Sequence, residues 1–165
     1  MDAEADKGSS FKDRPPNQES LGPLSLWSTF AILEWKIDCQ SQGTNGHLAS
    51  ISSKAEGAVL ARHIKAFLQG CQHVWIGLHD PQRPKPGSRR LTPKVKALKQ
   101  FQYYKNRRWR WSDRSIFNYR AWNTGEPSNF ENDEYCVELL CDSGYLTWND
   151  QNCKDESPYI CEFEL

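Results

Sequence analysis

Six cysteines constrain the fold of this chain more than any other feature of its sequence. The last four follow one another at intervals of four, eleven and seven residues, at Cys136, Cys141, Cys153 and Cys161. A structural zinc site requires close pairs such as C-x2-C or a matching pair of histidines, and these intervals supply neither. Six cysteines in one small domain therefore indicate disulfide bridges and an oxidising compartment, although the sequence alone does not choose among the possible pairings.

Length, total charge and motif content exclude several classes of protein. The chain has 165 residues, and single domains commonly run to ~100–200 residues. Its formal net charge is zero, which indicates neither a nucleic-acid nor a membrane partner. No apolar run approaches the ~18 residues of a spanning helix, and the residues after Met1 lack the basic and apolar segments of a secretory signal. No enzyme is predicted, because the sequence contains no G-x-S-x-G, no H-E-x-x-H and no phosphate-binding glycine loop with a lysine.

The charges are distributed unevenly along the chain. Eleven of the 21 Lys and Arg residues lie between Arg83 and Arg110, a segment without any acid. Nine acids and a single Lys lie between Glu126 and Glu156. The sequence therefore predicts a dipolar molecule that is basic in one segment and acidic in another.

The acidic segment is rich in oxygen donors that fall into two groups. One is the loop 125–134, which Pro127 stiffens, and the other is Asn149-Asp150, at the end of an alternating run (145–148) that predicts a strand. Carboxylate and amide oxygens suit a hard cation such as Ca²⁺, which takes ~6–8 oxygen ligands. These residues form either a cation site or a solvated acidic turn, which is a common feature of proteins.

The motifs of this part of the chain resemble those of the C-type lectin domain family. Residues 75–78 read W-I-G-L, 126–128 read E-P-S, and 148–150 read W-N-D. Glu134 lies two residues before a cysteine, and the chain closes with Y-I-C-E-F at 159–163. The resemblance covers residues 39–165 and is closest to small secreted lectins of the regenerating-protein and snake venom types. It implies an α+β fold in which two helices flank a small, mostly antiparallel sheet with a long calcium-binding loop region.

The resemblance also organises the chain into domains and elements. Residues 1–24 are expected to form a disordered tail, because they bury too little apolar surface to offset the entropy of ordering. Residues 25–165 are expected to form the lectin-like domain, with an inserted basic loop at about 84–105. Members of the family begin with a β-hairpin, and we recognise no counterpart of it in this sequence.

Two helices and four strands are predicted within this domain. Apolar spacing predicts a first helix over 27–39. A capping box, Ser53-x-x-Glu56, starts a second helix that ends at Gly70. The apolar stripe of that helix consists of Val59, Leu60, Ile64, Phe67 and Leu68. The strands are expected at 73–78, 135–140, 146–148 and 158–163.

The resemblance suggests two of the three disulfides, Cys39–Cys161 and Cys136–Cys153. Cys71 and Cys141 remain. If strands 73–78 and 135–140 are antiparallel neighbours, both of these cysteines lie at the end remote from the acidic loop. We therefore predict a third bridge, Cys71–Cys141.

Carried over residue by residue, the resemblance makes Glu126, Glu134, Asn149 and Asp150 ligands of one Ca²⁺ and of a sugar bound to it. Ser128 stands in the third place of the family's E-P-N motif and is predicted to contact both the ion and the sugar. In the family the Glu-Pro bond of this motif is cis. An E-P start with Asn149 resembles the mannose type of site, whereas the galactose type carries Q-P-D.

A second calcium ion is not expected. Asp80 matches one of its ligands in some relatives, but the next acid would fall on or near Pro84. The leading functional hypothesis is thus a secreted, calcium-dependent carbohydrate-binding lectin of the mannose type. The alternative is a calcium-independent module that binds a protein or a polyanion through the basic segment between Arg83 and Arg110. No oligomerising segment is apparent in the sequence.

Overall fold

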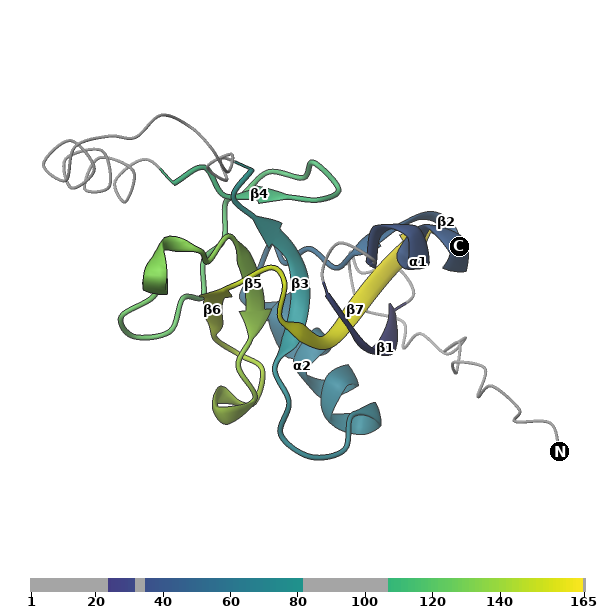
Figure 1. The fold of residues 1–165 in the computed structure, drawn as a ribbon. Coiled ribbons are helices and arrows are strands. Elements are labelled where there is room, and N and C mark those ends of the chain that lie inside the picture. The colour runs from purple at the N-terminus through teal and green to yellow at the C-terminus, as the bar shows by residue number, and fades with distance from the viewer. Residues whose placement is uncertain (1–23, 32–34, 82–106, 165) are drawn as a thin grey trace, which may run out of the picture.

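The computed structural model describes residues 24–31, 35–81 and 107–164 (Figure 1). The predicted tail and the predicted insert at 84–105 lie outside these residues, apart from Leu24, and the domain limits stay predictions. The elements are β1 (Leu24–Ala31), α1 (Trp35–Gln42), β2 (Thr44–Leu48), α2 (Lys54–Phe67), β3 (Val74–His79), β4 (Arg110–Trp111), η1 (Phe130–Asn132), β5 (Cys136–Leu139), η2 (Cys141–Ser143), β6 (Trp148–Gln151) and β7 (Glu156–Glu164).

One twisted sheet connects all the strands. Its main order is β1-β7-β3-β5-β6, with β2 paired to β7 and β4 paired to β3. Strand β7 lies parallel to β3, and every other pair is antiparallel. The prediction of an α+β fold with a mostly antiparallel sheet and a central W-I-G-L strand is therefore confirmed.

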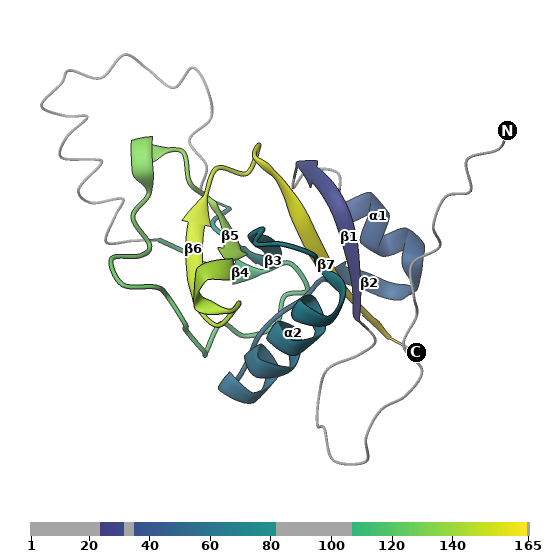
Figure 2. The ribbon, with the colours of Figure 1, turned by 90° about the horizontal axis from the view of Figure 1, so that it is seen from below.

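The two faces of β3 serve two separate cores, because successive side chains of a strand point to opposite sides. Val74, Ile76 and Leu78 are fully buried against the α2 face, where they join Leu60 and Ile64. Figure 2 shows α2 lying along this side of the sheet, while α1 lies beside β1 and β2.

The second core lies on the opposite face and is tied by disulfides. Trp75 and Tyr159 are buried there, beside Cys39 and Cys161. All three predicted bridges are present in the structure: Cys39–Cys161, Cys71–Cys141 and Cys136–Cys153. The antiparallel pairing of β3 with β5, from which the third bridge was predicted, is also confirmed.

The glycine of the W-I-G-L motif has a steric role. A Cβ atom on Gly77 would lie 2.6 Å from the Ser112 hydroxyl and 2.7 Å from the Leu48 carbonyl oxygen. The backbone of Gly77 is hydrogen-bonded to the two segments that cross it. Its N–H donates to Ala49 O, and its carbonyl accepts from Ser112 N, each at 2.9 Å. Only a residue without a side chain fits this close crossing of three segments.

The helix predicted over 27–39 is wrong in its first half. Residues Leu24–Ala31 form β1, and the helix α1 occupies Trp35–Gln42. Strand β1 pairs with β7 from Leu24↔Glu162 to Ala31↔Glu156 and supplies the N-terminal strand for which no counterpart was recognised. Pairing along a long neighbouring strand overrides a local periodicity that a short apolar run leaves ambiguous.

Two further expectations need correction. Strand β6 begins at Trp148, not at residue 146, because Tyr145 has a positive φ of 66° and turns the chain before the strand. At the start of α2, Ser53 accepts from Glu56 N as predicted, but the Glu56 carboxylate accepts from Ser52 N at 2.6 Å. The second half of the capping box therefore uses the residue before Ser53.

The helix α2 offers a direct test of which predicted stripe residues form the core. Ile64 is fully buried, whereas Phe67 is 42% exposed. We expect Ile64→Ala to lower the free energy of unfolding by about 2–5 kcal/mol, because it leaves a cavity. Phe67→Ala on the same helix is the matched control and should change it by less than about 1 kcal/mol. Urea unfolding of the oxidised protein measures both, and equal losses would contradict this assignment of the core.

Candidate functional site

The acidic loop, residues 125–134, is attached to the sheet through the segments on both sides of it. Trp122 forms a bridge with Trp148 at the start of β6, and Asn123 N donates to Trp148 O at 2.9 Å. After Glu134 the chain enters β5, which pairs with β6 through Val137↔Asp150. The loop thus leaves and rejoins the sheet next to the strand that carries Asp150.

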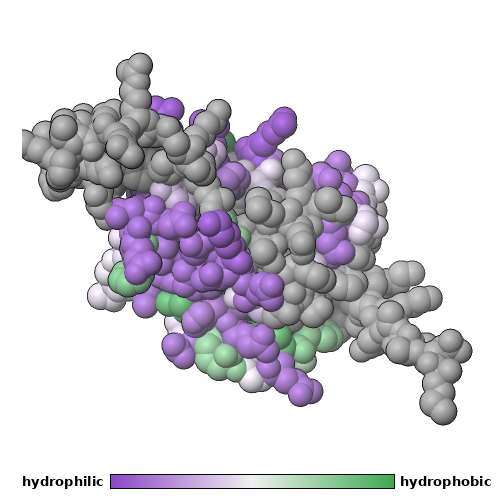
Figure 3. All heavy atoms as spheres, viewed as in Figure 1, coloured by the Kyte–Doolittle hydropathy of each residue, from purple (hydrophilic) through white to green (hydrophobic). Residues whose placement is uncertain are grey.

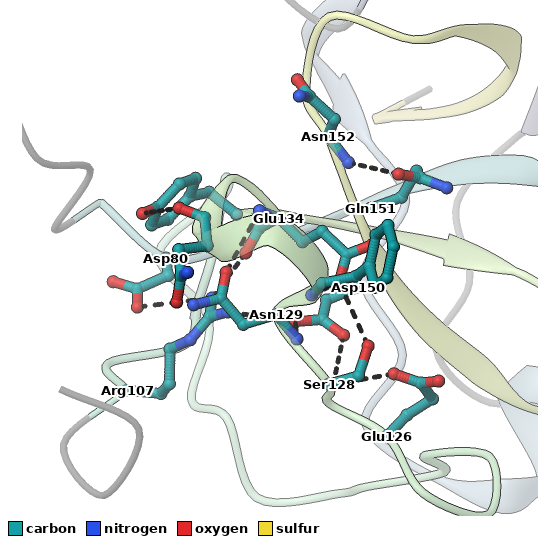
Figure 4. A network of polar contacts seen from close by, with 12 residues as sticks. Asp80, Arg107, Glu126, Ser128, Asn129, Glu134, Asp150, Gln151 and Asn152 are labelled. Atoms are coloured by element: carbon teal, nitrogen blue, oxygen red, sulfur yellow. Dashed lines mark hydrogen bonds and ion pairs between the residues drawn. The ribbon is translucent and has the colours of Figure 1, made fainter. Parts of the chain in front are cut away.

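Asp150 anchors the tip of this loop. Its side chain is fully buried, Oδ1 accepts from Ser128 N at 2.8 Å, and Oδ2 accepts from Asn129 N at 2.9 Å. Asn129 has a left-handed backbone with φ of 48°, a region that Asn enters more readily than most residues. A carboxylate on a rigid strand therefore sets the position of the loop backbone (Figure 4).

Two more carboxylates converge on Ser128. The Ser128 hydroxyl donates to Glu134 Oε2 at 3.2 Å, and the Ser128 backbone N–H donates to Glu126 Oε2 at 2.8 Å. Glu134 is held in turn by Phe130 N, which donates to Oε2, and by Asn129 Oδ1, which accepts from Glu134 N at 3.1 Å. Four of the five predicted site residues are therefore linked by direct contacts, and the Glu126-Pro127 bond is cis as predicted.

The fifth predicted residue makes a different contact. Asn149 lies next to Asp150 in β6, but its Nδ2 donates to Glu138 Oε1 at 3.1 Å. Glu138 is buried in β5, and the sequence analysis did not predict it as a site residue. The one feature that could have indicated it is a single acid in the otherwise apolar strand C-V-E-L. Burial raises the pKa of Glu138, and the bond from Asn149 opposes that shift.

Burial and mutual repulsion shape the charge of the cluster. The pKa of Asp150 lies at about 7, raised chiefly by burial and also by the side chain of Glu126, although the N–H groups of Ser128 and Asn129 and the Arg107 guanidinium lower it. Burial likewise raises the pKa of Glu134, with a smaller contribution from Glu126. The site therefore holds negative charge at an energetic cost that a bound cation would relieve.

Arg107 is a member of this site that the sequence did not single out. Its Nη2 donates to Asp150 Oδ2 at 3.0 Å, and its Nη1 donates to Glu134 O at 2.7 Å. Nothing in the sequence distinguishes it from the other ten cations between Arg83 and Arg110. Because Arg107 is buried against acids, it does not contribute to the polyanion surface proposed for that segment, most of which lies outside the described residues.

The donor set fits a hard cation better than any other ligand class. Carboxylate oxygens of Glu126, Glu134 and Asp150 are the atom type that Ca²⁺ prefers, and the Ser128 hydroxyl adds a neutral oxygen. Within the described residues, the three carboxylates do not form a group whose ligand atoms all lie within 4.8 Å of one another, so an ion would draw them closer. The described surface around β5 and β6 is largely hydrophilic (Figure 3), as expected for a site that binds a polar ligand.

Comparison with known proteins assigns the family. The profile described as "Lectin C-type domain" matches residues 33–163. The chain is a member of the C-type lectin domain family. A C-type lectin of Cerberus rynchops is 38% identical over 133 residues, which cover 81% of this chain and 70% of the relative. A "C-type lectin mannose-binding isoform" of Oxyuranus scutellatus is 42% identical over 124 residues, which cover 75% and 65%.

Solved structures agree with this assignment. Human lithostathine superposes with a TM-score of 0.67 at 30% identity, covering 92% of this C-type lectin domain and 100% of that chain. Lectin domains of this family are carbohydrate-binding modules, so the chain is a binding domain and not an enzyme. Among the described residues, no helix has the length and apolar character needed to cross a membrane.

The raised pKa values predict how the metal-free lectin domain responds to pH. A carboxyl whose pKa rises from 3.8 to about 7 on folding binds its proton more tightly in the folded state. Its stabilising contribution is complete below the ordinary value and is lost as the pH rises through 7. We expect the urea midpoint in calcium-free buffer to fall between pH 5 and pH 8, and Asp150→Asn to flatten this slope. An identical slope in the variant would show that Asp150 is not its source.

Proposed function

We propose that this C-type lectin domain binds carbohydrate through one Ca²⁺ and prefers mannose-type sugars. The observation that carries the proposal is the convergence of Glu126, Glu134 and Asp150 around Ser128, with Asp150 fixed in the sheet. The 42% identity to a mannose-binding isoform and the E-P-S motif support the sugar preference. Three disulfides support an extracellular location, since such bridges persist in oxidising compartments.

Each side chain has a defined part in this proposal. Glu126, Glu134 and Asp150 supply charged oxygens, and Ser128 supplies a neutral one. The bond from Asn149 Nδ2 to Glu138 leaves the amide oxygen as the end available to the ion. Bound calcium would supply coordination for two vicinal sugar hydroxyls. Glu126 would accept a hydrogen bond from one of these sugar hydroxyls, and the amide of Asn149 would donate a hydrogen bond to the other.

The contact of Asn149 with Glu138 bears on that last role. An amide nitrogen that donates to Glu138 still has a second N–H, because the amide group carries two. The partner carboxylate is buried and its pKa is raised, so a hydrogen bond from Asn149 stabilises its charged form. Glu138 therefore orients Asn149 while leaving one donor for a sugar.

Thermal unfolding tests the calcium and sugar parts of the proposal together. A ligand that binds only the folded state adds about 2.7 kcal/mol of stability at a hundredfold excess over its Kd. We expect excess Ca²⁺ to raise the midpoint above that in EDTA, mannose to raise it further, and galactose to leave it unchanged. Asp150→Asn is the control and should abolish the calcium response.

The other outcomes separate the parts of the proposal. If calcium raises the thermal midpoint and galactose, but not mannose, raises it further, the calcium site is retained and the mannose preference is contradicted. A cooperative transition that ignores calcium and both sugars would overturn the proposal and favour the calcium-independent alternative.

Ser128 provides a second test of the ligand set. A serine hydroxyl is a shorter and weaker calcium ligand than an asparagine amide oxygen, so the site is expected to be weaker than one with E-P-N. We predict that Ser128→Asn lowers the calcium Kd by roughly three- to tenfold, which corresponds to about 0.7–1.4 kcal/mol. Calorimetric titration measures the change. Ser115→Asn, at an exposed position, should leave the Kd unaltered, and an equal effect of both substitutions would remove Ser128 from the ligand set.

A further inference from the structure

Arg107 is a charged side chain enclosed by the protein. Its side chain is only 6% exposed, and those of its two acidic partners, Asp80 and Asp150, are fully buried. A buried ion is strongly unfavourable unless it is paired and hydrogen-bonded. The buried arginine therefore needs its acidic partners, and the two buried carboxylates need a positive charge beside them.

The guanidinium joins three separate segments that surround the acidic loop. Asp80 follows β3 and lies 3.7 Å from Nη1, while Asp150 in β6 accepts from Nη2 at 3.0 Å. The backbone carbonyl of Glu134, just before β5, accepts from Nη1 at 2.7 Å. Figure 4 shows Arg107 reaching toward Asp80 and the loop residue Asn129 from the opposite side to Glu126.

Two aromatic rings fix the guanidinium in place. Its central carbon lies 4.8 Å from the Trp109 ring centroid and 5.3 Å from that of Tyr135. Tyr135 is tied to the acidic partner, because Asp80 N donates to Tyr135 O at 2.8 Å. A planar fork that stacks and donates in two directions suits arginine and not lysine.

Arg107 and the loop share the same carboxylate. Asp150 Oδ2 accepts both from Arg107 and from Asn129 N, while Oδ1 accepts from Ser128 N. Arg107 therefore holds the Asp150 carboxylate in the position from which its two oxygens accept from the backbone N–H groups of Ser128 and Asn129. The acidic cluster thus contains a permanent positive charge supplied by its own chain.

We propose that Arg107 is a built-in cation that positions Asp150 and keeps the 126–134 loop ordered before any metal binds. The same charge restricts the site to one divalent ion, because a second ion between Asp80 and Asp150 would meet the guanidinium that already bridges them. Arg107 is a positioning residue in this account. The loop-ordering part is independent of the proposed calcium function, and the stoichiometry part rests on it.

The first experiment removes the charge and keeps the bulk of the side chain. In EDTA, Arg107→Met should lower the thermal midpoint by about 5–15 °C, because it removes the positive charge that offsets two buried carboxylates. Limited proteolysis should show faster cleavage within 126–134. Arg108→Met changes an exposed neighbouring arginine and should alter neither readout. An unchanged midpoint and cleavage rate in Arg107→Met overturn the proposal.

A double variant protects the test against a merely misfolded single variant. Asp80→Asn combined with Arg107→Met removes one of the two buried negative charges that Arg107 offsets, so it should be more stable than Arg107→Met alone, whereas Asp80→Asn alone should destabilise the protein. This sign reversal is the signature of coupling between the two residues. A double variant that loses the sum of the two single effects contradicts the coupling.

Calcium titration tests the second part. The unaltered domain should bind one Ca²⁺ per chain, and calcium should raise the midpoint of Arg107→Met by more than it raises that of the unaltered domain, because the ion replaces part of the missing charge. Two ions bound per unaltered chain would contradict the restriction. If the unaltered chain binds no calcium, the proposed function fails, while the measurements in EDTA still decide the role of Arg107.

Discussion

The carboxylate of Asp150 is the link between the rigid and the irregular halves of this lectin domain. The backbone of Asp150 belongs to β6 and pairs with Val137 of β5. Its carboxylate accepts hydrogen bonds from Ser128, Asn129 and Arg107. A loop with few apolar side chains has little burial to hold it, so its backbone needs acceptors elsewhere. A buried strand carboxylate supplies them at fixed positions. The arrangement of the acidic loop depends on that one group.

The sheet is built to keep this group in place. Strand β3 packs its two faces into two cores, with α2 on one side and the disulfide-tied segments on the other. The Cys136–Cys153 bridge holds the start of β5, where Cys136 pairs with Gln151, to the segment that follows β6. A binding loop on a scaffold of this kind can be irregular without being loosely positioned. The energetic cost of the site lies in its charge, because burial disfavours the ionised carboxylates of Glu134 and Asp150 and Arg107 offsets only part of that cost.

Local signals in the sequence succeeded where a motif or a short-range pattern fixed the outcome. The W-I-G-L strand was predicted from a short apolar run and from the family motif, and the structure adds that Gly77 lies at a crossing too close for a side chain. The failures occurred where partners distant in the sequence decide. Leu24–Ala31 became a strand through pairing with β7, and the amide of Asn149 turned to Glu138 eleven residues earlier.

The sequence by itself determined the family, the α+β fold and four side chains that meet at the loop, because each of these follows from motifs recognisable in order along the chain. The cysteine pairs followed only once the family resemblance and the pairing of two predicted strands were added. Only the tertiary structure decided that Arg107 enters the acidic cluster. Arg107 is chosen by distance and not by type, since folding brings it within 3.0 Å of a carboxylate 43 positions away and encloses both from water. Long-range electrostatic pairing of this kind leaves no local signature, because the sequence around a buried arginine can be the same as that around an exposed one.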